Sequence, residues 1–365
     1  MTEAETSMAI VQEWIDAYAG SEQVFEAMAQ VFPKADLFAL SRKRQVPLEL
    51  NNRAVRTTFL DHAWLRDRRS LTLPLMPVAW RLLGAGKYDV VLSSHHSFAH
   101  TNRLADGGTH LVYVHSPARY LWSPEIDGRG ASSYLGPARE VLRRVDLKAS
   151  RRVGAYAANS SEVASRIRAF WNREAVVIPP PVRVQYFSEP SSQAPTRDYV
   201  LGVGRWIPYK MLHKVIEAGD KAGLPVKIAG RGPDASRIDS AARSARVPVD
   251  VIEAPSDQQL RELYRNAACL VFPTVEDFGI VPVEAQAAGT PVVALAAGGA
   301  LDTVVEGKSG VFADDATAGA LAVSIKEAMH LSAEDCVASA SRFSAEKFAD
   351  RMRHWVASRG DSVVA

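Results

Sequence analysis

Glu276 and Glu284 flank a short apolar segment whose residue types can build a binding site for a phosphorylated ligand. Pro282 has no amide hydrogen and disfavours helix in the residue before it, so we expect it at the first position of a helix that Gly289 ends. The amides before it then point out of a helix N-terminus, where an anion, and phosphate above all, is stabilised. The residues that supply these amides are Phe278, Gly279, Ile280 and Val281.

Glu284 falls in the first turn of this expected helix. Its carboxylate could accept hydrogen bonds from the hydroxyls of a ribose. It could equally do no more than complement the positive end of the helix dipole. The residue types alone leave both interpretations open.

Basic residues follow a strand that we expect at residues 199–203, which places them at the carboxyl edge of a parallel sheet. Arg205, next to Gly204, can bind a phosphate through two parallel N–H groups, and Lys210 supplies a compact point charge. A solvated surface lysine is the alternative for Lys210. Arg231 lies in a Gly-Arg-Gly-Pro turn after the next expected strand. This turn either lines a nucleotide pocket or is an ordinary connection to a helix.

Histidines follow two of the apolar strands in the first half of the chain. His115 directly follows one of them, where an imidazole can donate a hydrogen bond to a sugar hydroxyl or to a developing oxyanion. A core histidine satisfied by the backbone is the alternative. His95, His96 and His100 follow the other strand. This trio lacks acidic partners nearby in the sequence, so we expect no metal there, and His95 or His96 is a candidate for contact with an acceptor molecule.

The length of 365 residues suits two domains or one large α/β domain. Hydrophobic residues make up 47% and charged residues 23%, the balance of a soluble globular enzyme, and no long stretch lacks apolar residues. No run approaches the ~18 apolar residues that a bilayer-spanning helix needs. Residues 1–8 hold two acids and no basic residue, so we expect no secretory signal. Cys269 and Cys336 are too few for a zinc cluster or a disulfide framework, which favours a reducing cytosol.

The net charge of +2 hides an asymmetry between the two halves. Residues 1–185 carry 24 Lys and Arg against 18 Asp and Glu, whereas the remainder carries 19 against 23. Arginine accounts for most of the excess and occurs in short clusters. A basic surface attracts phosphates or anionic lipid headgroups, and solvated arginines on amphipathic helices are the alternative.

Short apolar runs alternate with helical patterns, which predicts parallel sheets and βαβ units. The expected strands are residues 8–11, 36–40, 90–92, 111–114, 156–158, 176–178, 199–203, 226–229, 249–252 and 269–272. The expected helices are residues 22–31, 137–155, 161–171, 211–222, 235–246 and 257–266. Three consecutive prolines, residues 179–181, cannot enter a helix or the middle of a sheet. We therefore predict two doubly wound domains joined near residues 180–195, with ligands bound at the carboxyl ends of the strands and the site in a cleft between the domains.

The segment from Glu276 to Glu284, with its flanks, resembles the Glu-x7-Glu signature of the retaining glycosyltransferases of family GT4. Members of that family have the GT-B fold, an α/β architecture of two facing Rossmann-like domains. Further similar segments occur in the same order along the chain: residues 9–22, 114–122, 179–182, 204–210 and 298–302. The resemblance implies an acceptor-binding domain at residues 1–185, a nucleotide-sugar-binding domain at residues 196–342, and a C-terminal helix, about residues 343–358, that packs on the first domain.

The resemblance also implies roles for individual residues. The implied catalytic residues are His115, Arg205, Lys210 and Glu276, with Glu276 holding donor sugar hydroxyls. The implied donor-binding residues are Gly20, Gly204, Arg231, Phe278, Gly279, Ile280, Val281 and Glu284, with Glu284 on the ribose. The implied acceptor-binding residues are Arg119, Tyr120, Trp122 and His95, although packing is an equal alternative for the aromatic ones. The chain departs from the family at Ala19, where a glycine is usual, and at Gln12 and Glu13, where His-Asp is common, and we assign these two no catalytic role.

The family's chemistry is front-face transfer with retention, in which a donor phosphate oxygen takes the acceptor proton and no metal is needed. GDP-mannose is the donor we expect from the mannosyltransferase-like segments, and a UDP-sugar is the alternative. The acceptor is expected to be a saccharide or a lipid-linked saccharide, in the cytoplasm, with or without peripheral contact with the inner face of the membrane. A sugar-nucleotide epimerase of the same fold and a non-catalytic partner subunit are the two rival interpretations.

Overall fold

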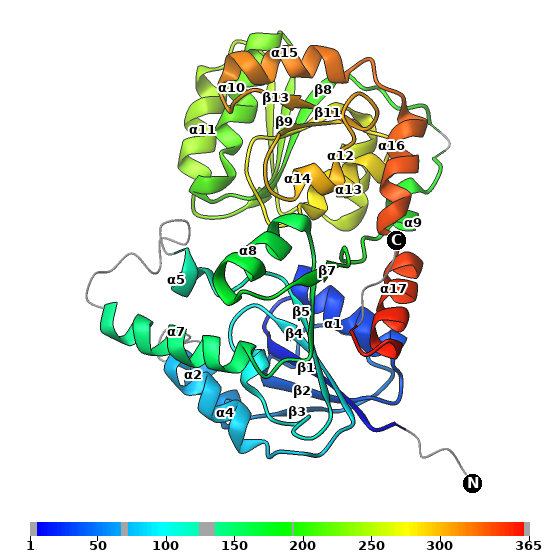
Figure 1. Ribbon diagram of the computed structural model, residues 1–365. Coiled ribbons are helices and arrows are strands. Elements are labelled where there is room, and N and C mark those ends of the chain that lie inside the picture. Colours follow the sequence, from blue (N-terminus) through cyan, green and yellow to red (C-terminus); the bar gives the residue numbers. More distant parts are fainter. Residues whose placement is uncertain (1–5, 67–71, 124–135, 192, 361–365) are drawn as a thin grey trace. The chain divides into compact units, whose positions relative to one another are not determined.

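The computed structural model describes residues 6–66, 72–123, 136–191 and 193–360 (Figure 1). It divides into two compact units. Unit 1 is Met1–Pro181 with Glu346–Ala365, and unit 2 is Val182–Ala345. The sequence prediction ended the first domain at residue 185 and began the second at residue 196. The structure begins unit 2 at Val182, so residues 182–185, which the prediction placed in the first domain, belong to unit 2 together with the intervening segment. The reason is that Val182, Val184 and Phe187 are buried in the core of that unit.

Unit 1 contains a seven-stranded, wholly parallel sheet with the order β3-β2-β1-β4-β5-β6-β7. The strands are β1 (Met8–Ile15), β2 (Asp36–Arg42), β3 (Val55–Thr57), β4 (Val90–His95), β5 (Thr109–Val114), β6 (Ala155–Ala158) and β7 (Ala175–Val177). Successive residues of β1 enter different cores: Ala9 and Val11 pack on one face of the sheet, and Ile10 packs on the other. A parallel sheet buried on both faces is the doubly wound arrangement.

Helices supply the two layers that cover this sheet (Figure 1). They are α1 (Gly20–Val31), α2 (Ala63–Arg66), α4 (Met76–Leu82), α5 (Arg119–Trp122), α7 (Gly136–Ser150), α8 (Ser161–Trp171) and α17 (Ala345–Ala357), with short 3-10 turns η1 (Phe59–Asp61), η2 (Leu73–Leu75) and η3 (Ala99–Thr101). Phe348, Met352 and Trp355 of α17 are buried with Phe25 and Met28 of α1 in a single core cluster. This packing confirms that the C-terminal helix returns to the first domain.

Unit 2 contains a six-stranded, wholly parallel sheet with the order β10-β9-β8-β11-β12-β13. The strands are β8 (Tyr199–Arg205), β9 (Val226–Arg231), β10 (Val249–Glu253), β11 (Ala267–Phe272), β12 (Val292–Leu295) and β13 (Gly310–Ala313). The helices are α9 (Val184–Ser188), α10 (Leu212–Ala222), α11 (Ala235–Ser244), α12 (Asp257–Asn266), α13 (Ile280–Ala287), α14 (Ala300–Thr303), α15 (Ala318–Ala328) and α16 (Ala333–Ala340), with η5 (Pro208–Lys210) and η6 (Ser341–Phe343). Val200 and Leu201, adjacent on β8, enter opposite cores, so this sheet is also covered on both faces.

Every predicted strand and helix exists, and two helices, α8 and α12, match in both bounds. The helix predicted to reach residue 155 ends at Ser150, because a turn separates it from β6. The prediction missed the edge strands β3 and β13, the strand β12, and the helices α4, α15 and α16. Several strands extend beyond their predicted ends, and this matters at β8, which runs to Arg205. Arg205 is therefore the last residue of the strand rather than a residue that follows it.

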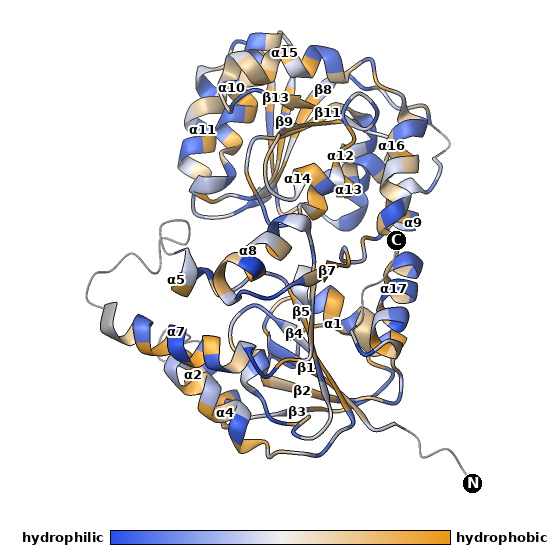
Figure 2. Cartoon of the chain, viewed as in Figure 1, coloured by the Kyte–Doolittle hydropathy of each residue, from blue (hydrophilic) through white to orange (hydrophobic). Residues whose placement is uncertain are grey.

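No helix among the residues that the structure describes is long and apolar enough to cross a bilayer. In Figure 2 the longer helices of both units show hydrophilic and hydrophobic residues side by side, as expected for helices that bury one face only.

Candidate functional site

The helix α13 in unit 2 begins at Ile280, two residues earlier than the sequence predicted. Gly279 is its N-cap with φ +87°, a left-handed conformation that glycine adopts without steric cost. Pro282 occupies the third helical position, where its missing amide hydrogen costs nothing because the first four amides of a helix have no partner inside the helix. The expectation that Pro282 starts the helix is therefore wrong. Ile280 and Val281 lie in the first turn, and their amides still belong to a helix N-terminus.

Two glycines hold the loop before α13 in place. The amide of Gly299 donates to the carbonyl oxygen of Glu276 at 2.8 Å. A Cβ atom on Gly298 would lie 2.5 Å from that same oxygen, and one on Gly299 would lie 2.2 Å from the carbonyl oxygen of Phe278. The Phe278 side chain is buried against Phe343 at 5.5 Å between ring centroids. Phe278 can thus contribute only backbone groups to a ligand site.

Lys210 is brought to this loop by the turn that follows β8. It ends η5, its side chain is buried and runs along Gly204, and its ammonium forms an ion pair with Glu276. The carbonyl oxygen of Tyr209 accepts a hydrogen bond from Thr274 at 2.9 Å, which ties η5 to the segment before Glu276. The surface-lysine alternative is therefore wrong: Lys210, Glu276 and the N-terminus of α13 form one cluster.

The prediction that Glu284 falls in the first turn is wrong: because α13 begins at Ile280, Glu284 lies beyond the first turn. Its Oε2 accepts a hydrogen bond from the hydroxyl of buried Tyr264 at 2.8 Å. Burial raises the pKa of Glu284 to about 7, with the Tyr264 hydrogen bond acting in the opposite direction. A carboxylate fixed by a buried tyrosine is more than a surface complement to the helix dipole. It is held in one orientation, as a residue that receives hydroxyl groups must be.

A cavity of about 240 Å³ lies at the carboxyl ends of β8 and β9 in unit 2. It is lined by Val203, Gly204, Arg205, Ala229, Gly230, Arg231, Ala254, Pro255 and Leu260. The two strand ends approach so closely that a Cβ on Gly230 would lie 1.8 Å from the carbonyl oxygen of Gly204. Arg205 and Arg231 are exposed and stand directly opposite each other in the sheet register. Like charges in that position repel, so the pair is suited to an anion that neutralises both.

Unit 1 presents a different group of side chains at the carboxyl edge of its sheet. Half-buried His115 follows β5, and its Nε2 lies 2.8 Å from the hydroxyl oxygen of Ser94 on β4. The ring of His96 lies 6.1 Å from that of His115 and contacts the edge of Trp14 at 4.3 Å between centroids. His115 is therefore not a histidine satisfied by the backbone alone. His96, one of the two histidines that the sequence named for contact with an acceptor, is thus the neighbour of His115, whereas Trp14, which contacts His96, is a residue that the sequence did not single out.

His95 does not share this environment, because its side chain is fully buried. Its Nδ1 lies 3.0 Å from Nδ1 of His100, and Nε2 of His100 lies 3.2 Å from the carbonyl oxygen of Asp146 on α7. The predicted contact of His95 with an acceptor disagrees with this placement, since the alternation of β4 turns the side chain into the core.

The donor atoms of His95, His100 and Asp146 lie within 4.8 Å of one another, so the fold supplies the acidic partner that the local sequence lacks. A proton on Nε2 of His100 satisfies the Asp146 carbonyl, and Nδ1 then accepts from His95. This arrangement uses both nitrogens of His100 in hydrogen bonds. We interpret the trio as a buried hydrogen-bond network.

The three predicted acceptor residues on α5 have different surroundings. The hydroxyl of Tyr120 lies 2.5 Å from that of Ser97, and Arg119 is half-buried. Trp122 stacks on Phe170 at 5.2 Å, and its Nε1 donates to Asp146 at 2.9 Å. Of the two interpretations for the aromatic side chains, packing is the one that Trp122 fits.

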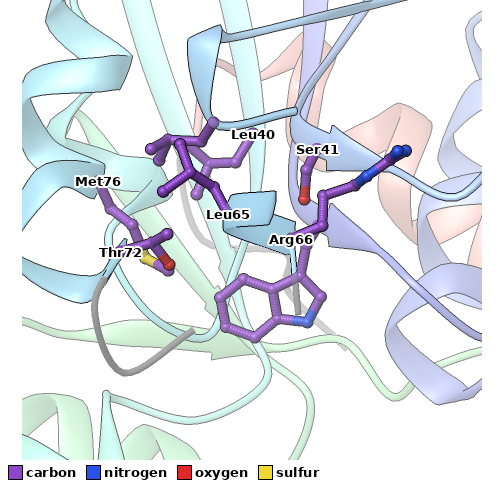
Figure 3. Close-up of a pocket in the computed structure, with 8 residues that line it drawn as sticks. Leu40, Ser41, Leu65, Arg66, Thr72 and Met76 are labelled. Carbon is purple, nitrogen blue, oxygen red and sulfur yellow. The ribbon is translucent and has the colours of Figure 1, made fainter. Parts of the chain in front are cut away.

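Gly20, predicted at the donor site, is the first residue of α1, and Ala19 before it is the N-cap. Residues 16–19 connect β1 to this helix. Unit 1 also has a cavity, which lies beside Trp14 and is shown in Figure 3. Leu40, Ser41, Leu65, Arg66, Thr72 and Met76 line it together with Leu60 and Trp14. Its volume of about 10 Å³ holds one water molecule and no sugar ring.

Comparison with known proteins places this architecture in a class. The search of solved structures finds glycosyltransferases of GT-B type, including HepE of Anabaena in complex with UDP and glucose, at a TM-score of 0.70 and 17% identity over 97% of this chain and 100% of that one. Sucrose-phosphate synthase of Thermosynechococcus elongatus matches at a TM-score of 0.73 and 18% identity, over 96% and 98%. The fold is therefore GT-B.

Two family models match consecutive parts of the chain. "Glycosyltransferase Family 4" matches residues 18–186, and "Glycosyl transferases group 1" matches residues 186–348. The chain belongs to the GT4 family of glycosyltransferases.

Curated relatives match a smaller share of their own length. A D-inositol 3-phosphate glycosyltransferase of Mycolicibacterium smegmatis is 30% identical over 224 residues, 56% of this chain and 49% of the relative. An alpha-1,3/1,6-mannosyltransferase of Dictyostelium discoideum is 46% identical over 56 residues, 15% of this chain and 13% of the relative. The chain spans about half the length of the first of these relatives, so its reaction is a matter for proposal.

Proposed function

We propose that this protein transfers a hexose from a nucleotide-diphosphate sugar to a hydroxyl group of a saccharide or lipid-linked saccharide, with retention of configuration. The observation that carries the proposal is the cluster in unit 2, where Lys210, Glu276 and the N-terminus of α13 converge beside the cavity that Arg205 and Arg231 line. Cations and helix amides in one place suit a diphosphate, and a carboxylate among them suits the hydroxyls of the sugar.

In this proposal the basic residues act on the leaving group. Negative charge grows on the diphosphate as the glycosidic bond breaks, so Arg205, Lys210 and the amides of residues 278–281 stabilise the transition state more than the ground state. Arg231 adds a further charge from the facing strand. The positive φ of Gly204 lets the backbone turn towards Lys210.

Two carboxylates orient the donor in the same proposal. Glu276 accepts hydrogen bonds from sugar hydroxyls while its ion pair with Lys210 keeps it charged. Glu284, fixed by Tyr264, accepts from the ribose. Retention then follows from front-face attack, with a donor phosphate oxygen taking the acceptor proton. This route needs neither a carboxylate nucleophile nor a metal, and the sequence has no Asp-x-Asp motif.

The acceptor is assigned to unit 1, at the edge that His115 occupies. Its imidazole, oriented by Ser94, can donate to an acceptor or sugar hydroxyl, and Arg119 and Tyr120 lie on α5 nearby in sequence. A lipid-linked acceptor is favoured by the arginine excess of residues 1–185. It is also favoured by exposed apolar side chains on η1, α2 and α4, namely Phe59, Trp64, Val78 and Leu82.

GDP-mannose is the donor proposed first, from the mannosyltransferase-like segments of the sequence and the mannosyltransferase among the relatives. A UDP-sugar is the second candidate, because the structural neighbours include complexes with UDP and with UDP-glucose. Both donors use the same diphosphate contacts, so the choice between them lies with the base and the sugar.

The test measures release of nucleoside diphosphate from GDP-mannose, UDP-glucose and UDP-N-acetylglucosamine, each with and without a mannoside or D-inositol 3-phosphate as acceptor. Turnover that depends on an acceptor is the expected result. Release of free sugar from the donor alone would instead favour an epimerase-like activity, and binding of GDP or UDP without any turnover would favour a non-catalytic subunit. Glu276→Gln is the matched inactive variant.

A further inference from the structure

Glu13 is a buried carboxylate in the middle of the chemistry-bearing edge of unit 1, and the function above gives it no role. It lies near the carboxyl end of β1, directly before half-buried Trp14, and its side chain is inaccessible to solvent. Its Oε1 accepts hydrogen bonds from the backbone amides of Ser97 at 3.0 Å and Ala99 at 2.6 Å. Ser97 lies in the turn between β4 and η3, and Ala99 is the first residue of η3.

That turn carries groups of the proposed acceptor edge. His96 precedes Ser97, contacts Trp14 and lies near His115. The hydroxyl of Ser97 lies 2.5 Å from that of Tyr120. One carboxylate oxygen therefore holds two backbone positions whose neighbours reach His115 on one side and α5 on the other.

The energetics explain why a carboxylate occupies this position. The turn has left the strand ladder of β4, so its amides need acceptors from elsewhere, and a buried amide without one costs about 1–3 kcal/mol. A charged acceptor shared by two N–H groups makes shorter and stronger hydrogen bonds than a neutral one. Nδ1 of His95 lies 3.7 Å from Oε1, but burial holds the pKa of His95 well below its usual value, so this neutral imidazole offers the carboxylate no ion pair.

We propose that Glu13 is a positioning residue for glycosyl transfer, which holds the turn of residues 96–99 so that His96, and Tyr120 through Ser97, line the acceptor edge beside His115. The inference rests on the proposed function in one respect, that this edge receives the acceptor. It goes beyond that function because it makes Glu13, a buried residue that no substrate touches, responsible for the positions of the side chains at this edge.

Three variants of the full chain test the proposal. Glu13→Ala removes both hydrogen-bond acceptors, whereas Glu13→Gln keeps a carbonyl oxygen of similar reach. Asp36→Ala is the matched control: Asp36 is a carboxylate on the neighbouring strand β2, at the opposite end of the sheet, where it accepts from the hydroxyl of Tyr88. All three are compared with wild type by melting temperature before other measurements.

The first readout is hydrogen–deuterium exchange of peptides that cover residues 96–101, which requires no ligand. Glu13→Ala should exchange at least about tenfold faster there, the factor that corresponds to one lost hydrogen bond, while Glu13→Gln and Asp36→Ala stay near wild type. Unchanged exchange in Glu13→Ala would overturn the proposal, because the turn would then be held by something else.

The second readout is turnover of the donor that wild type accepts, with D-inositol 3-phosphate or methyl mannoside as probe acceptor. Glu13→Ala should raise the acceptor KM or lower kcat by about tenfold or more, with the affinity for the free nucleoside diphosphate within twofold, and Glu13→Gln should recover most of the loss. Faster exchange with unchanged kinetics would reduce Glu13 to a structural role. An inactive wild type would refute the proposed function, while the exchange data would still decide whether Glu13 holds the turn.

Discussion

The carboxyl edges of the two sheets present different kinds of chemical group. In unit 2 the edge consists of backbone and fixed charges: the amides at α13, the close approach of Gly230 to Gly204, and the cations Arg205 and Lys210. In unit 1 the edge consists of imidazole, indole and hydroxyl side chains around His115, held by Ser94 and Glu13. A diphosphate is common to all nucleotide-diphosphate sugars, so a backbone site suits it. Acceptors differ among related enzymes, and side chains can change without altering the fold.

The largest expected effect concerns the charges of unit 2. Arg205→Ala and Lys210→Ala should each lower turnover by about 10²–10³, or about 3–4 kcal/mol, because each removes a preorganised contact to the growing charge of the leaving group. Arg205→Lys should recover only part of the loss if bidentate geometry matters. The two losses should combine less than additively. Steady-state kinetics at saturating donor and acceptor is the measurement.

Arg205→Ala should keep the melting temperature of wild type, because Arg205 is exposed. Lys210→Ala should lower the melting temperature, because it removes a buried side chain and leaves the Glu276 carboxylate without its ion pair. Turnover within threefold of wild type in either alanine variant would remove that residue from the site. It would also contradict the view that fixed charges distinguish the edge of unit 2 from that of unit 1.

Each edge also carries one buried carboxylate with a raised pKa, and this similarity is testable by pH. Burial raises the pKa of Glu13 and of Glu284 from 4.5 to about 7. Between these values the folded state keeps a proton that the unfolded state has released, so stability falls as pH rises from about 4.5 to 7 and is level above. Each group contributes an effect on the order of 3 kcal/mol over that window.

Glu13→Gln and Glu284→Gln should each flatten the pH dependence of the unfolding free energy between pH 5 and pH 8, measured by urea titration. Glu174→Gln, an exposed carboxylate, is the control and should leave the profile unchanged. A wild-type stability that rises over this window would contradict the raised pKa of both carboxyl groups.

The backbone character of unit 2 predicts sensitivity to a single methyl group. Gly299→Ala would bring a Cβ to 2.2 Å from the carbonyl oxygen of Phe278, so the loop before α13 must shift, at a cost of about 1–3 kcal/mol. Because this loop leads into the helix N-terminus, the affinity for a nucleoside diphosphate, measured by calorimetry, should also fall in Gly299→Ala. Gly319→Ala, in the helix α15, is the control, because its Cβ would meet the flexible end of Lys221 at 3.2 Å and Oγ1 of Thr317 at an ordinary contact distance of 3.9 Å. Equal affinity in the two variants would show that the loop is not part of the site.

A smaller effect is expected for Glu284→Ala, which should weaken the binding of the free nucleotide and of the sugar donor alike. The loss of one charged hydrogen-bond acceptor for the ribose corresponds to about 1.5–3 kcal/mol at most. Calorimetry with GDP and UDP is the measurement. Unchanged affinity for the nucleotide that wild type binds would remove Glu284 from the nucleotide site.

The weakest effect belongs to the surface of unit 1. The arginine excess of residues 1–185 predicts binding to anionic vesicles that weakens as salt rises. Co-sedimentation with phosphatidylglycerol vesicles should exceed that with phosphatidylcholine at low salt, and the difference should disappear at high salt. Equal binding to both at low salt would count against a membrane-associated acceptor.

The same contrast explains what the sequence could predict. Glycine and proline spacing report local backbone geometry, so the loop from Glu276 to Glu284 could be predicted from the sequence alone. The ion pair of Glu276 with Lys210, a residue far away in the sequence, could not, and only the family resemblance placed the two residues in one site. The error at Pro282 came from treating one proline preference as a rule, when Gly279 had already set the start of the helix. In unit 1 the partners lie far apart in sequence, such as Glu13 with Ser97 and Ala99, or His100 with Asp146. A carboxylate within an otherwise apolar strand was the one local signal for Glu13, and His95 gave no sign that its side chain faces inward.

The return of α17 to unit 1 has a consequence for how the chain is made. Unit 2 is continuous, from Val182 to Ala345, whereas unit 1 lacks Phe348, Met352 and Trp355 until the segment after unit 2 has been synthesised. Until then the cluster around Phe25 and Met28 stays open, with apolar surface exposed to other nascent chains. The unit whose residues come first therefore matures last, and a ribosome that stalls before α17 would release a protein with one finished half and one aggregation-prone half.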